Sequence, residues 1–254
     1  MRRLWVRWLG LLAFVVVLAT AFVNLGQWQL HRLEQRRERN ETVVQHEAAP
    51  VVPLATRGYD KVQEADQWQR VELRGTFDAD HQLQVRYRSN SGETGTEVVT
   101  PLRTTDGRVV LVDRGFIRTP KGEPPPATLP APPTGTVTVV GHLRRSENGP
   151  TAAITPGQGA VRLVNAPAIG RWLGAEVMDG YVGLLTVTPE QTGDFDPVAA
   201  PTLDEGPHFW YAVQWFMFCG FALVGLLWFV RNDIVERRKA RAAATPTDTP
   251  TQED

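Results

Sequence analysis

The sequence lacks most of the features that an enzyme or a disulfide-linked protein would need. Its 254 residues include a single cysteine, so neither an intrachain disulfide nor a Cys-x-x-Cys metal site can form. Nucleotide-binding glycine loops, the Gly-x-Ser-x-Gly elbow and the His-Glu-x-x-His zinc motif are all absent. Only three serines lie between the apolar runs, and none has a histidine at a suggestive spacing: Ser89, Ser91 and Ser146. These absences argue against a hydrolase, and we expect no enzymatic activity.

Charge of either sign is not in excess. The chain has 27 basic and 28 acidic residues and a formal net charge of −1, which gives no argument for nucleic-acid binding. Its 19 prolines lie outside the apolar runs, where they mark loops. The composition therefore fits one medium-sized domain together with membrane segments.

Two long uncharged runs dominate the chain. Phe209 to Val230 contains no charged side chain, and at 1.5 Å per residue it forms about 33 Å of helix, close to the ~30 Å hydrocarbon core of a bilayer. Leu9 to Val23 is also uncharged, and with Asn24 to Gly26 it reaches the short end of a membrane span. We therefore predict two transmembrane helices.

The first run has an alternative interpretation as a cleaved signal peptide. It follows a basic start, and Ala19-Thr20-Ala21 matches an Ala-x-Ala cleavage site. Apolar residues continue past that site, at Phe22, Val23 and Leu25, which favours a retained anchor. The helix formers from Leu25 to Asn40 predict that this helix continues beyond the membrane.

The charges beside the two spans predict the topology. Between Trp172 and Val230 there is no Lys or Arg, whereas five basic residues follow the second span: Arg231, Arg237, Arg238, Lys239 and Arg241. By the positive-inside rule both termini are cytoplasmic, as Arg2, Arg3 and Arg7 also indicate. The basic segment from Arg32 to Arg39 opposes this assignment.

The resulting division of the chain has five parts. We expect a cytoplasmic N-terminus, a first span, an extracytoplasmic domain, a second span and a disordered cytoplasmic tail, at residues 1–8, 9–27, 28–207, 208–230 and 231–254.

The central domain is predicted to be rich in strands. Alternating or continuous apolar patterns predict six of them, at Arg70–Phe77, Gln82–Tyr87, Thr96–Leu102, Arg108–Ile117, Thr136–Arg144 and Gly180–Val187. Thr119 to Pro133 is rich in proline and predicts an extended loop. Asn165 is a good N-cap for a short helix that ends near Leu173. The expected fold class is α+β, with two transmembrane helices flanking a mainly antiparallel sheet or partial barrel.

Two polar features of the chain could carry chemistry. His208 opens the second span, and Tyr211 and Trp215 share its helical face. Imidazole is the usual protein ligand of haem iron, although an interfacial histidine is the simpler interpretation. Gln214 lies within the span and is expected to hydrogen-bond to Gln27 or Gln29 on the first helix.

A third candidate is the sequence Asp113-Arg114-Gly115 at the end of a predicted strand. It could form a small charged site. The alternative that we favour is an Asp–Arg pair beside a glycine that lets the backbone bend.

Several stretches in order along the chain resemble the Surfeit locus protein 1 family of cytochrome c oxidase assembly factors. The stretches are Leu25–Leu33, Arg70–Phe77, Val99–Leu102, Leu111–Ile117 and His208 with Tyr211–Phe216. The family usually has asparagine where this chain has Asp113.

The resemblance implies a function in maturing subunit I of a haem-copper oxidase. Some bacterial relatives are thought to handle haem a, which makes His208 the implied metal ligand and Tyr211 and Trp215 the implied cofactor contacts. No presequence stands before the first span, so the implied location is a bacterial plasma membrane. The implied partners are subunit I, the respiratory supercomplex and membrane lipid. The alternative is a permanently bound accessory subunit of the oxidase or supercomplex that does not handle haem.

Overall fold

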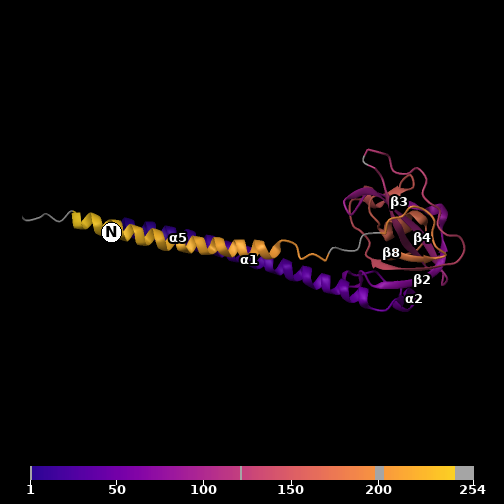
Figure 1. Cartoon of the computed structure of the whole chain (residues 1–254), viewed down its shortest axis with the longest axis horizontal. Helices are drawn as coiled ribbons and strands as arrows, with labels where there is room; N and C mark the ends of the chain where they lie inside the picture. Colours follow the sequence, from indigo (N-terminus) through magenta and orange to yellow (C-terminus); the bar gives the residue numbers. More distant parts are fainter. Residues whose placement is uncertain (1, 121, 198–202, 244–254) are drawn as a thin grey trace, which may run out of the picture. The chain divides into compact units, whose positions relative to one another are not determined.

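The computed structural model describes residues 2–120, 122–197 and 203–243. The chain divides into two compact units (Figure 1). One contains the residues up to Arg39 and those from Asp204 onward, and the other runs from Asn40 to Leu203. The prediction of a disordered tail at residues 231–254 was wrong as far as Ala243, because α5 continues to that residue, and the rest of the tail lies outside the described residues.

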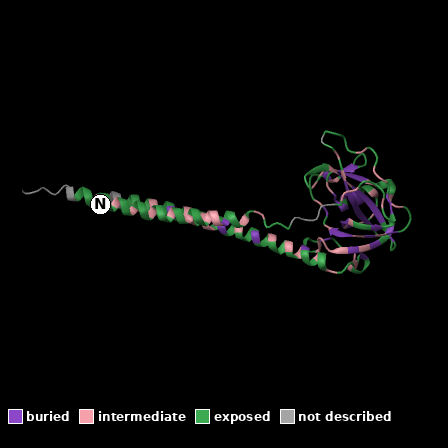
Figure 2. Ribbon diagram, in the orientation of Figure 1, coloured by how far each residue is buried: buried purple, intermediate pink, exposed green. Residues whose placement is uncertain are grey.

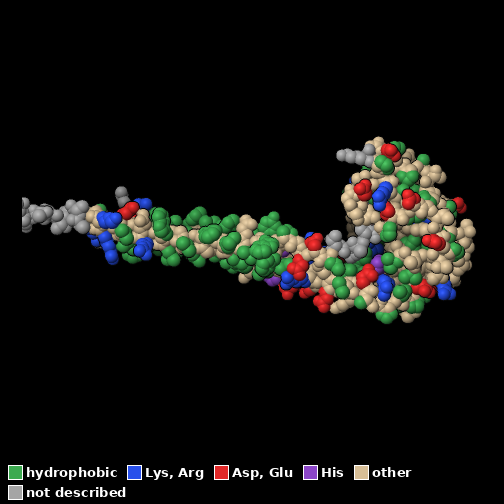
Figure 3. Space-filling model, viewed as in Figure 1, with side chains coloured by type: hydrophobic (Ala, Val, Ile, Leu, Met, Phe, Trp, Pro, Cys, Tyr) green, Lys and Arg blue, Asp and Glu red, His purple; other side chains and the backbone are tan. Residues whose placement is uncertain are grey.

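Two long helices form the first unit. Helix α1 covers Arg2–Ala48 and helix α5 covers His208–Ala243. Both are long and apolar enough to cross a membrane, with mean hydropathies of 2.3 and 2.0 in their most apolar windows. Figure 3 shows hydrophobic side chains along the helix pair and charged ones at its ends. As predicted, α1 continues well beyond the apolar run.

The apolar side chains of these helices are largely uncovered by protein (Figure 2). Val17, Phe221 and Leu227 are 66%, 67% and 70% exposed. Water contact at so much apolar surface would cost about 25 cal/mol per Å². A lipid environment removes that cost, so these faces fit a bilayer.

The two helices run antiparallel and meet through aromatic contacts. Phe22 stacks on Trp215 with ring centroids 5.8 Å apart, and it also contacts Phe218. A Cβ at Gly26 would lie 2.7 Å from the ring of Phe216, so any larger residue would require that ring to shift. Near the other end, Trp8 Nε1 donates a hydrogen bond to Asp233 at 3.1 Å.

The second unit is built on an eight-stranded mixed sheet. Its strands are β1 (Val52–Pro53), β2 (Arg70–Phe77), β3 (Leu83–Asn90), β4 (Glu93–Thr104), β5 (Val109–Arg118), β6 (Val137–Arg144), β7 (Ala160–Val161) and β8 (Val177–Thr188). The strand order is β1-β2-β6-β8-β5-β4-β3-β7. Short helical segments fill the connections: α2 (Leu54–Arg57), α3 (Thr151–Ile154), α4 (Ala166–Leu173) and two 3-10 turns, Glu64–Asp66 and Ala79–His81.

A further pairing between β2 and β4 closes five of these strands into a small barrel. At the closure, a Cβ on Gly75 would come within 2.2 Å of the Arg103 carbonyl oxygen, so glycine is required there. Most neighbouring strands are antiparallel, but β5 pairs with β8 in parallel. The α+β class, the six predicted strands and the mainly antiparallel sheet are confirmed.

Two apolar clusters hold the domain together. The first lies on one face of the sheet and includes Leu73, Val110 and Val112. The second lies on the other face, where Leu111 packs with Ile169 of α4. Strand β5 therefore contributes alternate side chains to the two clusters, as strand geometry requires. The predicted cap of α4 is confirmed, because the Asn165 side chain accepts a hydrogen bond from the Ala168 amide at 3.0 Å.

The glycine beneath the Phe216 ring provides a test of the helix pairing. Gly26→Leu should lower the stability of the pair by about 1–3 kcal/mol, because overpacking of this size forces side chains from their places. Titration of the full chain with SDS, followed by tryptophan fluorescence, measures the change.

Gly10→Leu on the same helix is the matched control, since no atom lies within 4 Å of its added Cβ. It should leave the midpoint unchanged or slightly raised, because leucine favours helix over glycine. Equal midpoints for the two variants would contradict the described packing.

Candidate functional site

His208 is the first residue of α5 and is held by a side chain of α1. Its Nδ1 lies 2.8 Å from Oε1 of Gln29. An amide oxygen can only accept, so in the neutral imidazole the proton lies on Nδ1 and the lone pair on Nε2. Within the described part of the chain no group is bonded to Nε2. One helix thus supplies an imidazole, and the other fixes which nitrogen is available.

The three predicted site residues are placed differently. His208 and Trp215 both contact α1, through Gln29 and Phe22 respectively. Tyr211 is 46% exposed. Gln29 has His208 as its partner, so the expected pairing of Gln29 with Gln214 is not what the structure shows. The sequence marked both residues as polar groups at the ends of apolar runs, but it gave no signal that they contact each other.

His208 is the residue of this helix pair that could hold a haem, through its Nε2. A free imidazole Nε2 is the donor that haem iron takes from histidine. The exposed rings of Phe209, Trp210 and Tyr211 follow within the first turn of α5, and of these Tyr211 shares the helical face of His208. Among the residues that the structure describes, no group of three or more His, Cys, Asp or Glu could hold a metal ion.

Acidic residues just before α5 pair with the basic stretch of α1. Arg37 makes two hydrogen bonds of 2.8 Å to Glu205. Arg36 lies 3.5 Å from Asp204. The arginines that opposed the predicted topology are therefore partly compensated by carboxylates at the same end of the helix pair.

The expected pair between Asp113 and Arg114 does not form. Neighbouring residues of a strand point to opposite faces, and these two follow that rule. Gly115 does have a positive φ of 133°, as a bend would require, and its amide donates to Asp113 at 3.2 Å. The interpretation as an ion pair was wrong, because it ignored strand alternation.

Arg114 is fully buried and serves the fold. Its guanidinium donates to the Gln82 and Gln191 side chains at 2.6 and 3.1 Å. It also donates to the carbonyl oxygens of Pro130 and Ala131 at 2.9 and 3.1 Å. Burial lowers its pKa to about 10, which leaves it charged at neutral pH. Arg114 therefore ties the proline-rich loop to the barrel and is not a surface site.

Asp113 belongs to a buried group of charges that the sequence did not reveal. Arg88 contacts Glu97 at 2.6 Å and Glu147 at 2.8 Å. One guanidinium thus serves two carboxylates, and Asp113 is a third acid in the same surroundings. Burial, and then the nearby Glu97 carboxylate, raise the pKa of Asp113 well above its usual value. Burial likewise raises the pKa of Glu97.

Comparison with known proteins agrees with the resemblance. A family model described as the SURF1 family matches residues 16–220. The chain belongs to the SURF1 family. Members of the SURF1 family are known as cytochrome oxidase assembly factors and are generally non-enzymatic.

Relatives in the SURF1 family come from bacteria and eukaryotes. An uncharacterized SURF1-like protein of Mycobacterium tuberculosis (strain H37Rv) is 32% identical over 250 residues, covering 96% of this chain and 90% of the relative. Surfeit locus protein 1 of Takifugu rubripes is 29% identical over 152 residues, covering 53% and 61%. A SURF1-like protein of Rickettsia felis is 30% identical over 104 residues, covering 40% and 44%.

The buried Asp113 of this SURF1 family member makes the stability of its domain depend on pH. The unfolded chain releases this proton near pH 3.9, whereas the folded chain keeps it to higher pH. The folded state then binds more protons, so stability falls as pH rises through this window. Asp113→Asn keeps an acceptor for the Gly115 amide and removes the charge. It should be more stable than the native chain at pH 8 by about 1 kcal/mol or more, which is roughly 2–4 °C in melting temperature.

Thermal unfolding of the full chain in detergent between pH 4 and pH 8 measures this difference. The melting temperatures of Asp113→Asn and the native chain should become equal near pH 4. Asp106→Asn is the control, and its effect on stability at neutral pH should have the opposite sign. A hydrogen bond from Thr104 lowers the pKa of the exposed Asp106, so its loss should slightly destabilise the domain at neutral pH. A loss of stability in Asp113→Asn at pH 8 would contradict a raised pKa of Asp113 in the folded chain.

Proposed function

We propose that this chain is an assembly factor of a haem-copper cytochrome c oxidase that assists the insertion of haem a into subunit I. The observation that carries the proposal is the imidazole of His208, whose Nδ1 is held by Gln29 and whose Nε2 is available. Family membership supplies the oxidase as the partner. Haem a is the cargo in this scheme, bound through His208 beside Tyr211 and Trp215 and then passed on.

The proposed location is a bacterial plasma membrane, with α1 and α5 as spans and both termini in the cytoplasm. Two apolar helices and the coverage of the mycobacterial relatives support it. Residues 231–241 hold five basic side chains and only two acidic ones, whereas Arg36 and Arg37 face Asp204 and Glu205. The strand-rich domain would then stand on the extracytoplasmic side.

A carrier function requires His208 to bind haem reversibly. His208→Ala should remove the haem absorbance spectrum from full-length protein that is purified from membranes making haem a. His31→Ala is the matched control, because His31 is exposed on α1 two residues after Gln29. An unchanged spectrum in His208→Ala would remove this residue as the ligand.

The same variant tests the oxidase partnership in cells. Membranes with His208→Ala as the only copy should contain oxidase with a reduced content of haem a. Normal haem a content and activity, in this strain and in one lacking the gene, would contradict the proposal. Recovery of the chain in equal amounts with active oxidase, without haem on His208, would instead indicate an accessory subunit.

Gln29 should act as a positioning residue for His208. Hydrogen bonds to the second nitrogen of a ligating histidine fix its ring and raise its basicity, and their loss typically weakens metal binding 10- to 100-fold. We therefore expect Gln29→Leu to weaken haem binding by about tenfold in a titration of the detergent-solubilised chain. Gln27→Leu, an exposed neighbour of the same chemistry, is the control. Equal affinities for the two variants would show that Gln29 does not act on His208.

A further inference from the structure

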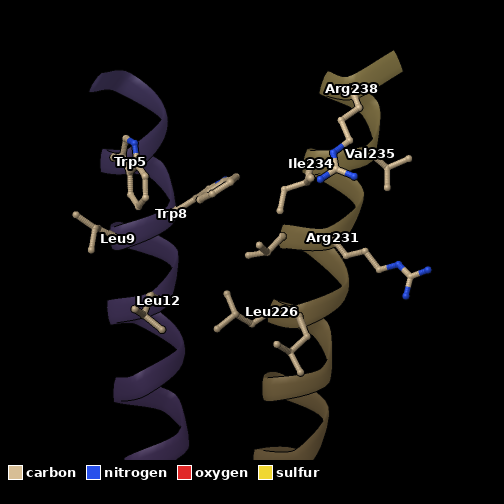
Figure 4. A pocket seen from close by; sticks show the side chains of 11 residues that line it. Trp5, Trp8, Leu9, Leu12, Leu226, Arg231, Ile234, Val235 and Arg238 are labelled. Atoms are coloured by element: carbon tan, nitrogen blue, oxygen red, sulfur yellow. The ribbon is translucent and has the colours of Figure 1, made fainter. Parts of the chain in front are cut away.

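A groove lies between the two helices at the end opposite His208. It has a volume of about 690 Å³. Leu9 and Leu12 of α1 and Leu226 and Val230 of α5 form its apolar walls. Figure 4 shows Trp8 pointing across from α1 towards α5 above these leucines. The groove is therefore open to its surroundings, and the surfaces of α1 and α5 beside it are also apolar.

Two arginines stand at the upper rim of this groove, Arg231 and Arg238. Arg231 directly follows the last residue of the uncharged run, and Arg238 is two turns further along α5. Figure 4 shows the guanidinium of Arg238 turned back along α5 towards Ile234, and the side chain of Arg231 extended on the side of α5 away from α1. Both cations can thus reach the level of the lipid headgroups, where Trp5 and Trp8 also lie, as is typical of membrane interfaces.

These two arginines have no carboxylate partner within the part of the chain that the structure describes. The nearby Asp233 is already bonded to Arg237 at 2.8 and 3.0 Å and to Trp8 at 3.1 Å. Glu236 accepts a hydrogen bond from Asn232 at 3.1 Å. The rim of the groove therefore carries two uncompensated positive charges above an apolar floor.

We propose that the groove binds one anionic phospholipid. Its phosphate would be held by Arg238 and Arg231, and an acyl chain would lie against Leu12, Leu226 and their neighbours. Guanidinium forks match phosphate oxygens, and basic pockets between transmembrane helices on the cytoplasmic side bind anionic headgroups. The volume falls in the range of about 300–1,000 Å³ that is typical of small-ligand sites. A further helix would not provide the two negative charges at this depth, which is why we favour lipid.

Native mass spectrometry of the full chain tests the proposal. The chain is released from nanodiscs containing equal amounts of phosphatidylglycerol and phosphatidylcholine, and the retained lipid is identified. We expect the native chain to retain phosphatidylglycerol preferentially. Each arginine near a membrane surface contributes roughly fivefold, so Arg231→Gln with Arg238→Gln should reduce the preference by about 25-fold.

Lys239→Gln is the matched control, because it removes one charge next to Arg238 at a residue that does not line the groove. It should keep the preference, whereas Arg238→Gln alone should reduce it about fivefold. Leu12→Trp should displace the acyl chain with both arginines intact.

Three results would overturn the proposal. The first is equal retention of the two lipids by the native chain, or none. The second is an unaltered preference in the double arginine variant or in Leu12→Trp. The third is a dimer without lipid, which would assign the groove to a second copy of the chain.

Discussion

The ring of Phe216 lying against Gly26 is the contact on which the rest of the helix pair depends. It favours one register of α5 against α1, because a larger residue at position 26 would force the ring to shift. From this register, the start of α5 brings His208 to Gln29, and its far part brings Asp233 to Trp8. The apolar contact and the two polar contacts are thus consistent with one register of the helix pair.

The parts of the fold that were predictable from sequence depend on local pattern. The length and lack of charge of Phe209–Val230 predict a helix whatever its neighbours are, and the helix is there. Alternation from Arg70 to Phe77 likewise predicts a strand with one buried face, and β2 has the same bounds. The Asn165 cap needs only the three residues that follow it. Each of these signals lies within one element.

The parts that were not predictable depend on residues far apart in the chain. Gln29 and His208 are separated by 179 residues, so spacing could name both as polar residues near spans but could not join them. The cluster of Arg88, Glu97 and Glu147 draws on separate segments, and its charges appear in the sequence as ordinary strand polarity. The parallel pairing of β5 with β8 is also non-local. The separation of Asp113 from Arg114 could have been predicted from the sequence, because neighbouring residues of a strand point to opposite faces.

The arrangement around His208 suits a cargo that must be released. A resident haem is often held by two axial ligands or by an enclosed apolar pocket, whereas this helix pair offers one imidazole and an exposed Tyr211. Binding through a single ligand at a lipid-facing surface limits affinity, and a partner can approach the same face. The hydrogen bond that His208 Nδ1 donates to Gln29 counters this weakness without adding a ligand, because it orients the ring and raises the basicity of Nε2. The proposed carrier would therefore select haem through the orientation of the His208 ring. The exposed side of the site would let a partner take the haem.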